Sequence, residues 1–188
     1  MIQIRIHGRG GQGVVTAAEL LASSAFHDGL YAQAFPSFGV ERSGAPIQSF
    51  VRLDKQPIIT REQIYNPDIL IIQDDSLLTE KEVLMGINKK SILIINSQSN
   101  PAELEKLLKN KISRANIYPS PATEIALELL GKNLVNTVIL GSFAQATEMI
   151  SIKSLMAAIA DKFADKGAEI INKNKDAVLK AYQYGKKA

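Results

Sequence analysis

Residues 7–13 have the composition of a loop that binds an anion. They read His-Gly-Arg-Gly-Gly-Gln-Gly, and a run that favours a helix follows them directly. Glycine lets the backbone approach another group closely, and the free N–H groups and dipole at the start of a helix favour negative charge. We expect the side chains of Arg9 and Gln12 to lie nearest a bound phosphate or other anion. The complete candidate cradle consists of Gly8, Arg9, Gly10, Gly11, Gln12 and Gly13.

The same loop has a simpler interpretation as a tight turn that binds nothing. Gly8, Gly10 and Gly13 satisfy the spacing G-x-G-x-x-G, which is a weak signal by itself. Four glycines exceed what a turn needs, and Arg9 places a cation beside them. The bare turn and the anion cradle therefore both stay open.

The residues after the loop argue against a dinucleotide. NAD-binding proteins of the Rossmann type place an acidic side chain at the end of the second strand, where it bonds the ribose. Here the strand predicted at residues 31–35 runs into Pro36-Ser37, while Asp28 precedes that strand and Glu41 comes too late. The lysine of a Walker loop is missing as well. A free-standing nucleotide-binding oxidoreductase of Rossmann type remains the alternative function.

A second stretch, residues 36–46, is suited to contact with another protein. It is bounded by prolines, contains two glycines, and carries an acidic and a basic residue side by side between aromatic and small residues. A rigid loop of this kind offers aromatic anchors together with a charge pair that fixes the register of docking. A solvated loop whose ion pair contributes little is the simpler alternative. The candidate interface residues are Phe35, Phe38, Glu41 and Arg42.

The remaining titratable residues do not form a recognisable catalytic centre. Asp74 and Asp75 follow a buried strand, and we interpret them as caps of the next helix rather than as metal ligands or acid–base groups. Their position at the carboxyl end of a strand, where α/β proteins bind ligands, keeps the second interpretation open. For His7 we expect a structural role, and no serine stands in a G-x-S-x-G sequence. We therefore predict no catalytic residue and no metal site in this chain.

The composition excludes several classes of protein. The chain has no cysteine, which excludes disulfides, a thiol nucleophile and a cysteine-ligated iron–sulfur cluster, and its two histidines make a zinc site improbable. A net charge of +3 spread along 188 residues is too weak for a nucleic-acid interface. No signal-peptide pattern or long apolar span is present, so we expect a cytoplasmic protein without a membrane segment.

Periodicity and turn residues predict one α/β domain over residues 1–188. Short apolar strands alternate with helices, which is typical of a Rossmann-like, mostly parallel sheet flanked by helices, here with additional C-terminal helices. Residues 47–53 alternate like a strand and a turn leads from them into residues 58–60, so we expect a β-hairpin inserted into this core. Strands are predicted at residues 2–7, 31–35, 68–73, 91–95 and 117–118, and helices at residues 13–26, from 76 or 79, from 101, at 121–131, 136–150, 152–165 and 168–184.

Two of these elements carry a further expectation. The first strand places its isoleucines on one face and Gln3, Arg5 and His7 on the other, so the second face is either solvated or covered by something polar. The helix at residues 136–150 is apolar on most sides and rich in small residues. Such a helix is buried, either in the core or against another subunit.

Taken together, the two motifs resemble the gamma subunit of 2-oxoacid:ferredoxin oxidoreductases, in particular the pyruvate branch (pyruvate synthase). The resemblance rests on residues 7–13 with the Thr/Ala-rich helix after them, and on residues 33–46, which read Gln-Ala-Phe-Pro-Ser-Phe-Gly-Val-Glu-Arg-Ser-Gly-Ala-Pro. Lys166-Gly167 and the helix at residues 174–185 are similar to the end of that family. The resemblance therefore spans the whole chain.

The resemblance implies a non-catalytic subunit of an enzyme that converts pyruvate and coenzyme A reversibly to acetyl-CoA and CO2 while it reduces ferredoxin. In that family thiamine diphosphate lies in the alpha and beta subunits, the 4Fe-4S clusters lie in the beta and delta subunits, and Mg²⁺ also belongs to the partners. The gamma subunit packs against the catalytic subunits on the side where coenzyme A enters. A glycine cradle with Arg9 would then suit a phosphate of coenzyme A, and ferredoxin would be met through the complex.

The second motif also indicates the branch of the family. Relatives specific for 2-oxoglutarate tend to have Tyr-Gly-Pro-Glu at this place, whereas residues 38–42 here read Phe-Gly-Val-Glu-Arg. This form favours pyruvate or branched-chain 2-oxoacids, and the corresponding subunit of an arylpyruvate oxidoreductase is a further alternative.

Overall fold

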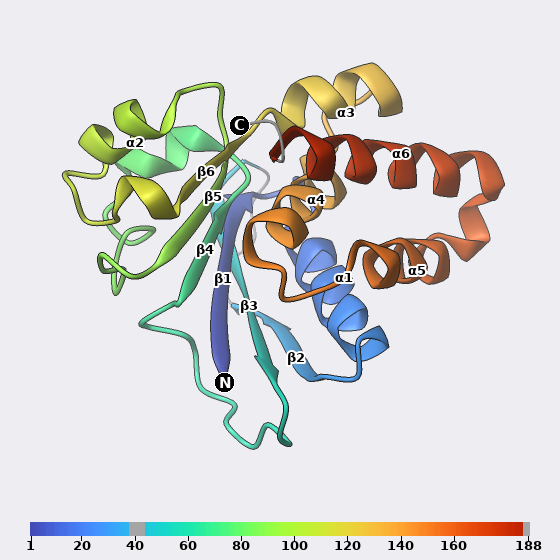
Figure 1. Cartoon of the computed structure of the whole chain (residues 1–188), viewed down its shortest axis with the longest axis horizontal. Helices are drawn as coiled ribbons and strands as arrows, with labels where there is room; N and C mark the ends of the chain where they lie inside the picture. The colour runs from blue at the N-terminus through green and yellow to red at the C-terminus, as the bar shows by residue number, and fades with distance from the viewer. Residues whose placement is uncertain (38–43, 186–188) are drawn as a thin grey trace.

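A six-stranded sheet with helices on both faces forms the centre of the molecule (Figure 1). The computed structural model describes residues 1–37 and 44–185. Helices α1, α3, α4, α5 and α6 lie on one face of the sheet, and α2 lies on the other with the short 3₁₀-helix η1. The helices are α1 (Val14–His27), η1 (Asp75–Thr79), α2 (Pro101–Leu107), η2 (Arg114–Asn116), α3 (Ala122–Leu130), α4 (Val135–Thr147), α5 (Ile152–Lys162), η3 (Ala164–Lys166) and α6 (Ala168–Gly185).

The strands follow the order β2-β3-β1-β4-β5-β6 across the sheet. β1 pairs in parallel with β4, and β5 joins β4 to β6 in parallel, whereas β3 is antiparallel to both β1 and β2. Within the described residues only β3 runs against the other strands, so the predicted α/β class with a mostly parallel sheet is confirmed. The strands are β1 (Ile2–Arg9), β2 (Tyr31–Pro36), β3 (Pro46–Asp54), β4 (Ile69–Ile72), β5 (Ile92–Asn96) and β6 (Ile117–Ser120).

The predicted hairpin is wrong in its pairing. Residues 47–53 do form a strand, but β3 pairs with β1 on one side and with β2 on the other. Residues 58–60 belong to no strand. Pro57 lacks a backbone N–H, and the side chain of Ile59 is 89% exposed. This segment therefore offers neither the hydrogen bonds nor the burial that a second strand needs.

The connection between β4 and β5 also differs from the expected helix. It contains only η1, after which turns lead to β5. Thr79, one of the two predicted starting points of that helix, lies instead at the end of η1 and donates its hydroxyl to the Ser76 carbonyl at 2.9 Å. The other predicted helices are confirmed as α1, α2, α3, α4, α5 and α6, with shifts of a few residues at their ends.

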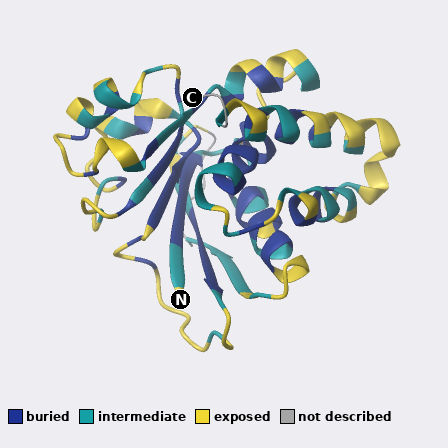
Figure 2. Ribbon diagram, viewed as in Figure 1, coloured by how far each residue is buried: buried dark blue, intermediate teal, exposed yellow. Residues whose placement is uncertain are grey.

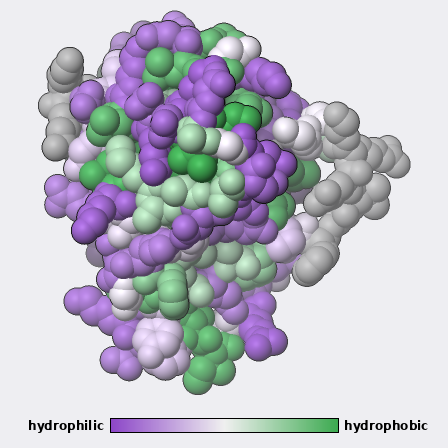
Figure 3. Space-filling view, turned by 90° about the vertical axis from the view of Figure 1, so that its right-hand side faces the viewer, coloured by the Kyte–Doolittle hydropathy of each residue, from purple (hydrophilic) through white to green (hydrophobic). Residues whose placement is uncertain are grey.

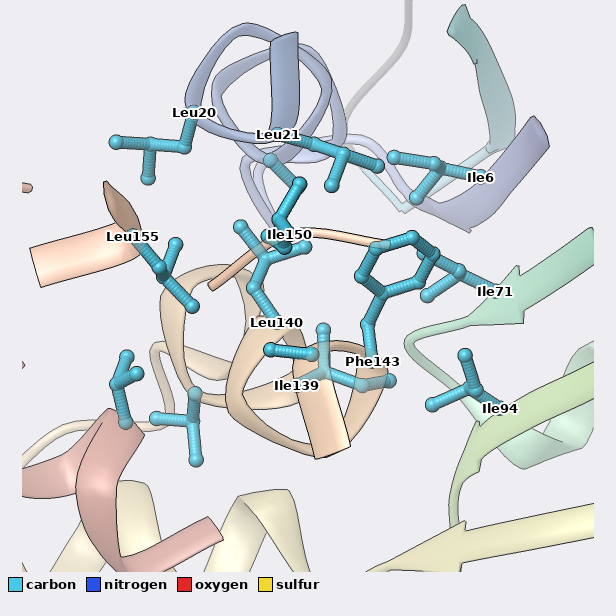
Figure 4. Close-up of a cluster of buried hydrophobic side chains, with 14 of the residues drawn as sticks. Ile6, Leu20, Leu21, Ile71, Ile94, Ile139, Leu140, Phe143, Ile150 and Leu155 are labelled. Carbon is cyan, nitrogen blue, oxygen red and sulfur yellow. The ribbon is translucent and has the colours of Figure 1, made fainter. Parts of the chain in front are cut away.

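α4 is the helix around which the larger core is built. Ten of its residues are buried, and Figure 4 shows Ile139, Leu140 and Phe143 among side chains from α1, α5 and the sheet. Burial of apolar surface at roughly 25 cal/mol per Å² makes this cluster the main source of stability. The prediction that this helix is buried is confirmed, since its surroundings here are the sheet and the other helices.

A smaller hydrophobic core lies on the face of the sheet opposite α4. That second cluster packs Leu70, Ile72, Leu93 and Ile95 of the strands against Leu104 of α2. Figure 2 shows that burial concentrates in the sheet and in α4, while many turns at the ends of the strands are exposed. On the side formed by α5 and α6, hydrophilic side chains interrupt the apolar areas (Figure 3).

Candidate functional site

The glycine loop joins the carboxyl end of β1 to α1 and is fixed by backbone hydrogen bonds. The Gly10 N–H donates to the Ala45 carbonyl at 2.8 Å, and the Gly44 N–H donates to the Gly10 carbonyl at 3.1 Å. The loop therefore pairs with the segment that precedes β3. Because β1, β4, β5 and β6 are parallel, all of them end at this edge of the sheet. This is the edge at which α/β proteins bind ligands.

Two of the glycines are required by the fold itself. Gly13, the residue before α1, has a φ of 71°, and a Cβ there would lie 2.6 Å from Asn136 Nδ2. A Cβ on Gly8 would lie 2.6 Å from a methyl carbon of Val14. Side chains at these positions would collide with α1 or α4. The bare turn therefore explains these two glycines without a ligand, and the cradle depends on the polar side chains around them.

The side chains of Arg9 and Gln12 meet at the loop, where they surround a carboxylate of the chain itself. Arg9 Nε lies 3.3 Å from Asp74 Oδ2, and Gln12 Nε2 donates to the same oxygen at 3.0 Å. Arg9 Nη1 donates to the Gly44 carbonyl at 3.2 Å, and Arg9 Nη2 donates to Ser76 Oγ at 2.7 Å. The cation that was expected to attract a ligand is thus paired within the chain.

Asp74 also caps η1, which confirms the capping interpretation for this residue. Its Oδ1 accepts hydrogen bonds from the Ser76 backbone N–H at 3.2 Å and from the Ser76 hydroxyl. Burial acts to raise the pKa of Asp74. Hydrogen bonds from Ser76 and Gln12, followed by the charge of Arg9, outweigh burial and hold that pKa below its ordinary value. Asp74 is therefore ionised at neutral pH.

The neighbouring Asp75 faces a different partner. Its Oδ2 accepts a hydrogen bond from Ser97 Oγ at 3.0 Å, so the two adjacent carboxylates do not converge on one point. Within residues 1–37 and 44–185, no group of three or more histidine, cysteine or acidic side chains is placed to hold a metal ion. Asp75 therefore makes a contact of its own, separate from the glycine loop.

His7 and Arg5 project from β1 on the face opposite Ile4 and Ile6. Both are only 4% exposed, and they line an open cavity of about 610 Å³. Burial, and then the charge of Arg5, lower the pKa of His7 to about 3. The imidazole is therefore neutral at pH 7, and it does not act as a cation beside the loop. His7 Nε2 has no hydrogen-bond partner in the part of the chain that the structure describes.

Arg5 organises this face in a way that sequence reasoning missed. Its Nη2 donates to the carbonyls of Val83 and Met85 at 2.8 and 2.7 Å, and its Nη1 donates to those of Ile64 and Tyr65 at 3.4 and 3.5 Å. One guanidinium thus holds two irregular segments against β1. The alternation of polar residues in β1 left two alternatives open, a solvated face or a polar covering, and the backbone carbonyls on Arg5 correspond to the second. Nothing in the local sequence indicated which distant carbonyls would provide it.

Of the four candidate interface residues, the structure describes one. The ring of Phe35 lies 5.1 Å from the ring of Phe50 and 5.2 Å from the guanidinium carbon of Arg52. It therefore packs along β2 and β3 and stabilises that edge of the sheet. The other candidates, Phe38, Glu41 and Arg42, lie outside the described residues.

The fold and the loop define an α/β protein of Rossmann-like type, with an internally paired glycine loop at the carboxyl edge of its sheet. The chain belongs to the pyruvate ferredoxin/flavodoxin oxidoreductase family, which it matches over residues 3–184. It is 46% identical over 183 residues to the Pyrococcus furiosus protein named pyruvate/ketoisovalerate oxidoreductases common subunit gamma, covering 97% of this chain and 96% of that protein. It is 45% identical to the pyruvate synthase subunit PorC of Methanothermobacter marburgensis, covering 97% of both chains.

Solved structures of related proteins have the same fold as this chain. The pyruvate oxidoreductase subunit PORC from Thermotoga maritima superposes with a TM-score of 0.81 at 31% identity, covering 97% of this chain and 95% of that one. The 2-oxoglutarate:ferredoxin oxidoreductase from Magnetococcus marinus shares the fold, with a TM-score of 0.79 at 22% identity, and the match covers 31% of that longer chain. Among the residues described, no helix has the length and apolar character needed to cross a membrane.

Proposed function

We propose that the chain is the gamma subunit of a heteromeric pyruvate:ferredoxin oxidoreductase and takes no direct part in the chemistry. The enzyme converts pyruvate, coenzyme A and oxidised ferredoxin to acetyl-CoA, CO2 and reduced ferredoxin. The observation that carries this proposal is similarity over nearly the whole chain to proteins named as gamma and PorC subunits, at 46% and 45% identity. In this role the chain would assemble with catalytic partners and would also contact coenzyme A.

In this proposal the cofactors belong to the alpha, beta and delta subunits. Thiamine diphosphate with Mg²⁺ and the 4Fe-4S clusters would lie in those partners, and ferredoxin would dock on the assembled complex. Iron–sulfur clusters are held by cysteine thiolates, and this chain has no cysteine with which to hold one. The complex would work in the cytoplasm, with no nucleic-acid or membrane partner for this subunit.

Coenzyme A is the co-substrate that the glycine loop would contact. It carries a phosphomonoester and a diphosphate, and the loop offers Arg9, Gln12 and the N-terminus of α1, a combination suited to phosphate oxygens. Because Arg9 Nε already lies 3.3 Å from Asp74, a bound phosphate has to compete with that carboxylate. The thiol end of the coenzyme would be left to the catalytic subunits.

The choice of 2-oxoacid is proposed to lie with the partner chains. The relative from Pyrococcus furiosus is named as a subunit common to pyruvate and ketoisovalerate oxidoreductases. A subunit that serves two enzymes cannot by itself select between their substrates. Branched-chain and arylpyruvate oxidoreductases therefore remain alternative complexes, and a substrate panel on the assembled enzyme separates them.

A free-standing nucleotide-binding enzyme of Rossmann type fits the sheet less well. In a dinucleotide-binding fold the second strand lies beside the first and carries the acidic residue that bonds the ribose. Here β3 separates β2 from β1, and β2 ends at Pro36 without an acidic residue. The ribose would therefore lack its usual partner beside the glycine loop.

A tagged copy of the chain, purified anaerobically from its source organism, tests the proposal. We expect it to co-purify with subunits that carry thiamine diphosphate and iron–sulfur clusters. The eluate should reduce a viologen dye only when both pyruvate and coenzyme A are supplied. A lone colourless protein that retains a nucleotide would instead support the Rossmann-type alternative.

A further inference from the structure

The loop proposed to bind a phosphate already holds a carboxylate. Asp74 Oδ2 lies 3.3 Å from Arg9 Nε and accepts a hydrogen bond from Gln12 Nε2 at 3.0 Å. Arg9 and Gln12 come from the loop, whereas Asp74 comes from the segment after β4, and the Gln12–Asp74 pair is separated by 62 residues of sequence. One oxygen of the chain thus takes the place that an oxygen of a phosphate would take on these two side chains.

An incoming anion can replace Asp74 as the partner of Arg9. The side chains of Arg9 and Asp74 are 33% and 23% exposed, so water and ions reach them. Ion pairs in such a setting are weak, because solvent screens them. The other oxygen of Asp74, Oδ1, accepts from the Ser76 backbone N–H at 3.2 Å and so anchors the residue to η1 independently of Arg9. Asp74 can therefore release Arg9 while it continues to cap η1.

Beneath the glycine loop, the side-chain amide of Gln73 makes no hydrogen bond within the described residues. Gln73 is fully buried, and neither of its amide atoms has a partner within the described residues. Gln73 Oε1 and Gln12 Oε1 both lie 3.0 Å from the position that a Cβ on Gly8 would take. An unpaired buried amide is costly. The amide of Gln73 therefore needs a hydrogen-bond partner, either a ligand or a water, and this is a second and independent indication of a ligand at the loop.

We propose that Asp74 is a specificity-determining residue, an internal carboxylate that occupies the anion position on Arg9 and Gln12 and yields only to an incoming phosphate. This inference rests on the proposed contact between the loop and coenzyme A. It adds that the contact is an exchange of one anion for another. The consequence is selection among anions by their charge.

The selection follows from the charges exchanged. A phosphomonoester carries about −1.5 to −2 charges at neutral pH and three acceptor oxygens, whereas Asp74 carries one charge. A carboxylate ligand, including the carboxylate of a 2-oxoacid, would replace Asp74 with a group of equal charge and gain little. A phosphate gains charge and acceptors on the same donors. The loop would therefore accept coenzyme A and reject a monocarboxylate such as the 2-oxoacid.

Calorimetric titration of the full chain with coenzyme A and with sodium acetate, at fixed ionic strength, tests this exchange. Asp74→Asn keeps an oxygen to cap η1 but removes the competing charge, so we expect it to bind coenzyme A about two- to fivefold more tightly. It should also gain measurable affinity for acetate. Asp75→Asn is the matched control, since it removes the same charge one residue away, where the partner is Ser97. Its affinities should equal those of the unmodified chain.

The Arg9→Ala variant separates the two levels of the proposal. Arg9→Ala should weaken coenzyme A binding, and adding Asp74→Asn to it should then bring no gain. If Arg9→Ala weakens binding but Asp74→Asn does not tighten it, the exchange is wrong and the phosphate contact stands. If the unmodified chain does not bind coenzyme A, or Arg9→Ala binds as tightly as it does, the proposed contact fails and the exchange fails with it.

A measurement on the unmodified chain covers the case in which Asp74→Asn does not fold. Binding of coenzyme A should free Asp74 from Arg9 and Gln12, so its pKa, followed by the side-chain carboxyl signal in NMR, should rise toward the ordinary aspartate value. Addition of acetate should leave the pKa of Asp74 unchanged. An Asp74 signal that is unchanged at saturating coenzyme A would overturn the exchange.

Discussion

Arg9 and Asp74 set the charge of the glycine loop between them. The guanidinium makes contacts with Asp74, Ser76 and the Gly44 carbonyl, so its donors are directed into the loop rather than into solvent. An exposed ion pair contributes at most about 1 kcal/mol. That free energy is too small to keep every other anion away from Arg9, but it is large enough to influence which anion binds there.

At this scale the first prediction concerns the assembled enzyme. Arg9→Ala should raise the KM for coenzyme A about tenfold, because a charge-assisted hydrogen bond to a phosphate contributes about 1.5–3 kcal/mol. The KM for pyruvate should stay within about twofold if the pyruvate site belongs to the partner chains, as proposed. Initial rates with either substrate varied give both constants.

Arg114→Ala is the control for that comparison. It removes an arginine whose exposed side chain pairs with Glu105, away from the loop. It should change neither constant. Equal increases in both KM values for Arg9→Ala would show that the loop does not contact coenzyme A.

Among the elements, α4 and α6 approach each other closely at Gly141. A Cβ there would lie 2.2 Å from the Val178 carbonyl oxygen. Helix propensity alone predicts that Gly141→Ala stabilises the protein by about 1 kcal/mol. We expect the opposite sign, a loss of about 1–3 kcal/mol in the free energy of unfolding, because the helices must separate. Urea denaturation measures it, and a stabilised variant would show that the two helices have room to adjust.

Asp28 links the end of α1 to the start of α5. Its carboxylate accepts hydrogen bonds from Ser151 N–H at 2.6 Å, from Ser151 Oγ at 2.8 Å and from Ser154 Oγ at 2.6 Å. Burial acts to raise the pKa of Asp28. Hydrogen bonds from Ser154 and Ser151, and the nearby His27, outweigh it and hold the pKa below the ordinary value of 3.8. This lowered pKa makes the link dependent on pH.

Asp28→Ala should lower the free energy of unfolding by about 1 kcal/mol at neutral pH, as the loss of a helix cap does. Since the folded state depresses the pKa, the stabilisation by Asp28 is complete above the ordinary carboxyl pKa and is lost as the pH falls through the depressed one. Urea denaturation at pH 7 and at about pH 3 should therefore show a smaller difference from the unmodified chain in acid. Asp176→Ala, which removes an exposed carboxylate of α6, is the control. A difference independent of pH would mean that the carboxylate charge does not matter.

The elements that could be predicted are those whose signals are local. The capping box of Asn100 and Glu103 and the left-handed Gly131 after α3 depend on residues a few positions apart, and both are present. The pairing of β3 with β1 could not be read from its own alternation, because alternation does not name a partner. The turn after residues 47–53 suggested residues 58–60 as the partner strand, which is wrong.

In the candidate site, too, the contacts between residues close in sequence could be predicted and those between distant residues could not. The loop and the meeting of Arg9 with Gln12 follow from three residues of sequence separation and a strand–loop–helix pattern. The pairing with Asp74 joins segments 62 residues apart, and the carbonyls around Arg5 lie up to 80 residues away. These contacts exist only once the sheet has formed, so no motif in the sequence specifies them.

For the whole molecule, the loop at residues 36–46 is expected to hold the chain in its complex. Arg42→Ala should weaken assembly by about 2 kcal/mol or more if this arginine is an interface anchor. Titration of the chain into its purified partners, followed by native mass spectrometry, measures the affinity. Arg61→Ala, at an exposed arginine in a different connection, is the matched control. A fully assembled and active complex with Arg42→Ala would show that the loop is incidental.

Cells of the source organism that lack this chain offer the most direct measurement of its role. Their anaerobic extract should show little reduction of a viologen dye with pyruvate and coenzyme A, because the remaining subunits lack a component. Addition of the purified chain alone should restore that activity in proportion to the amount added. An extract that is fully active without the chain, or one that the purified chain leaves inactive although the partner subunits are present, would contradict its assignment as a subunit of this enzyme.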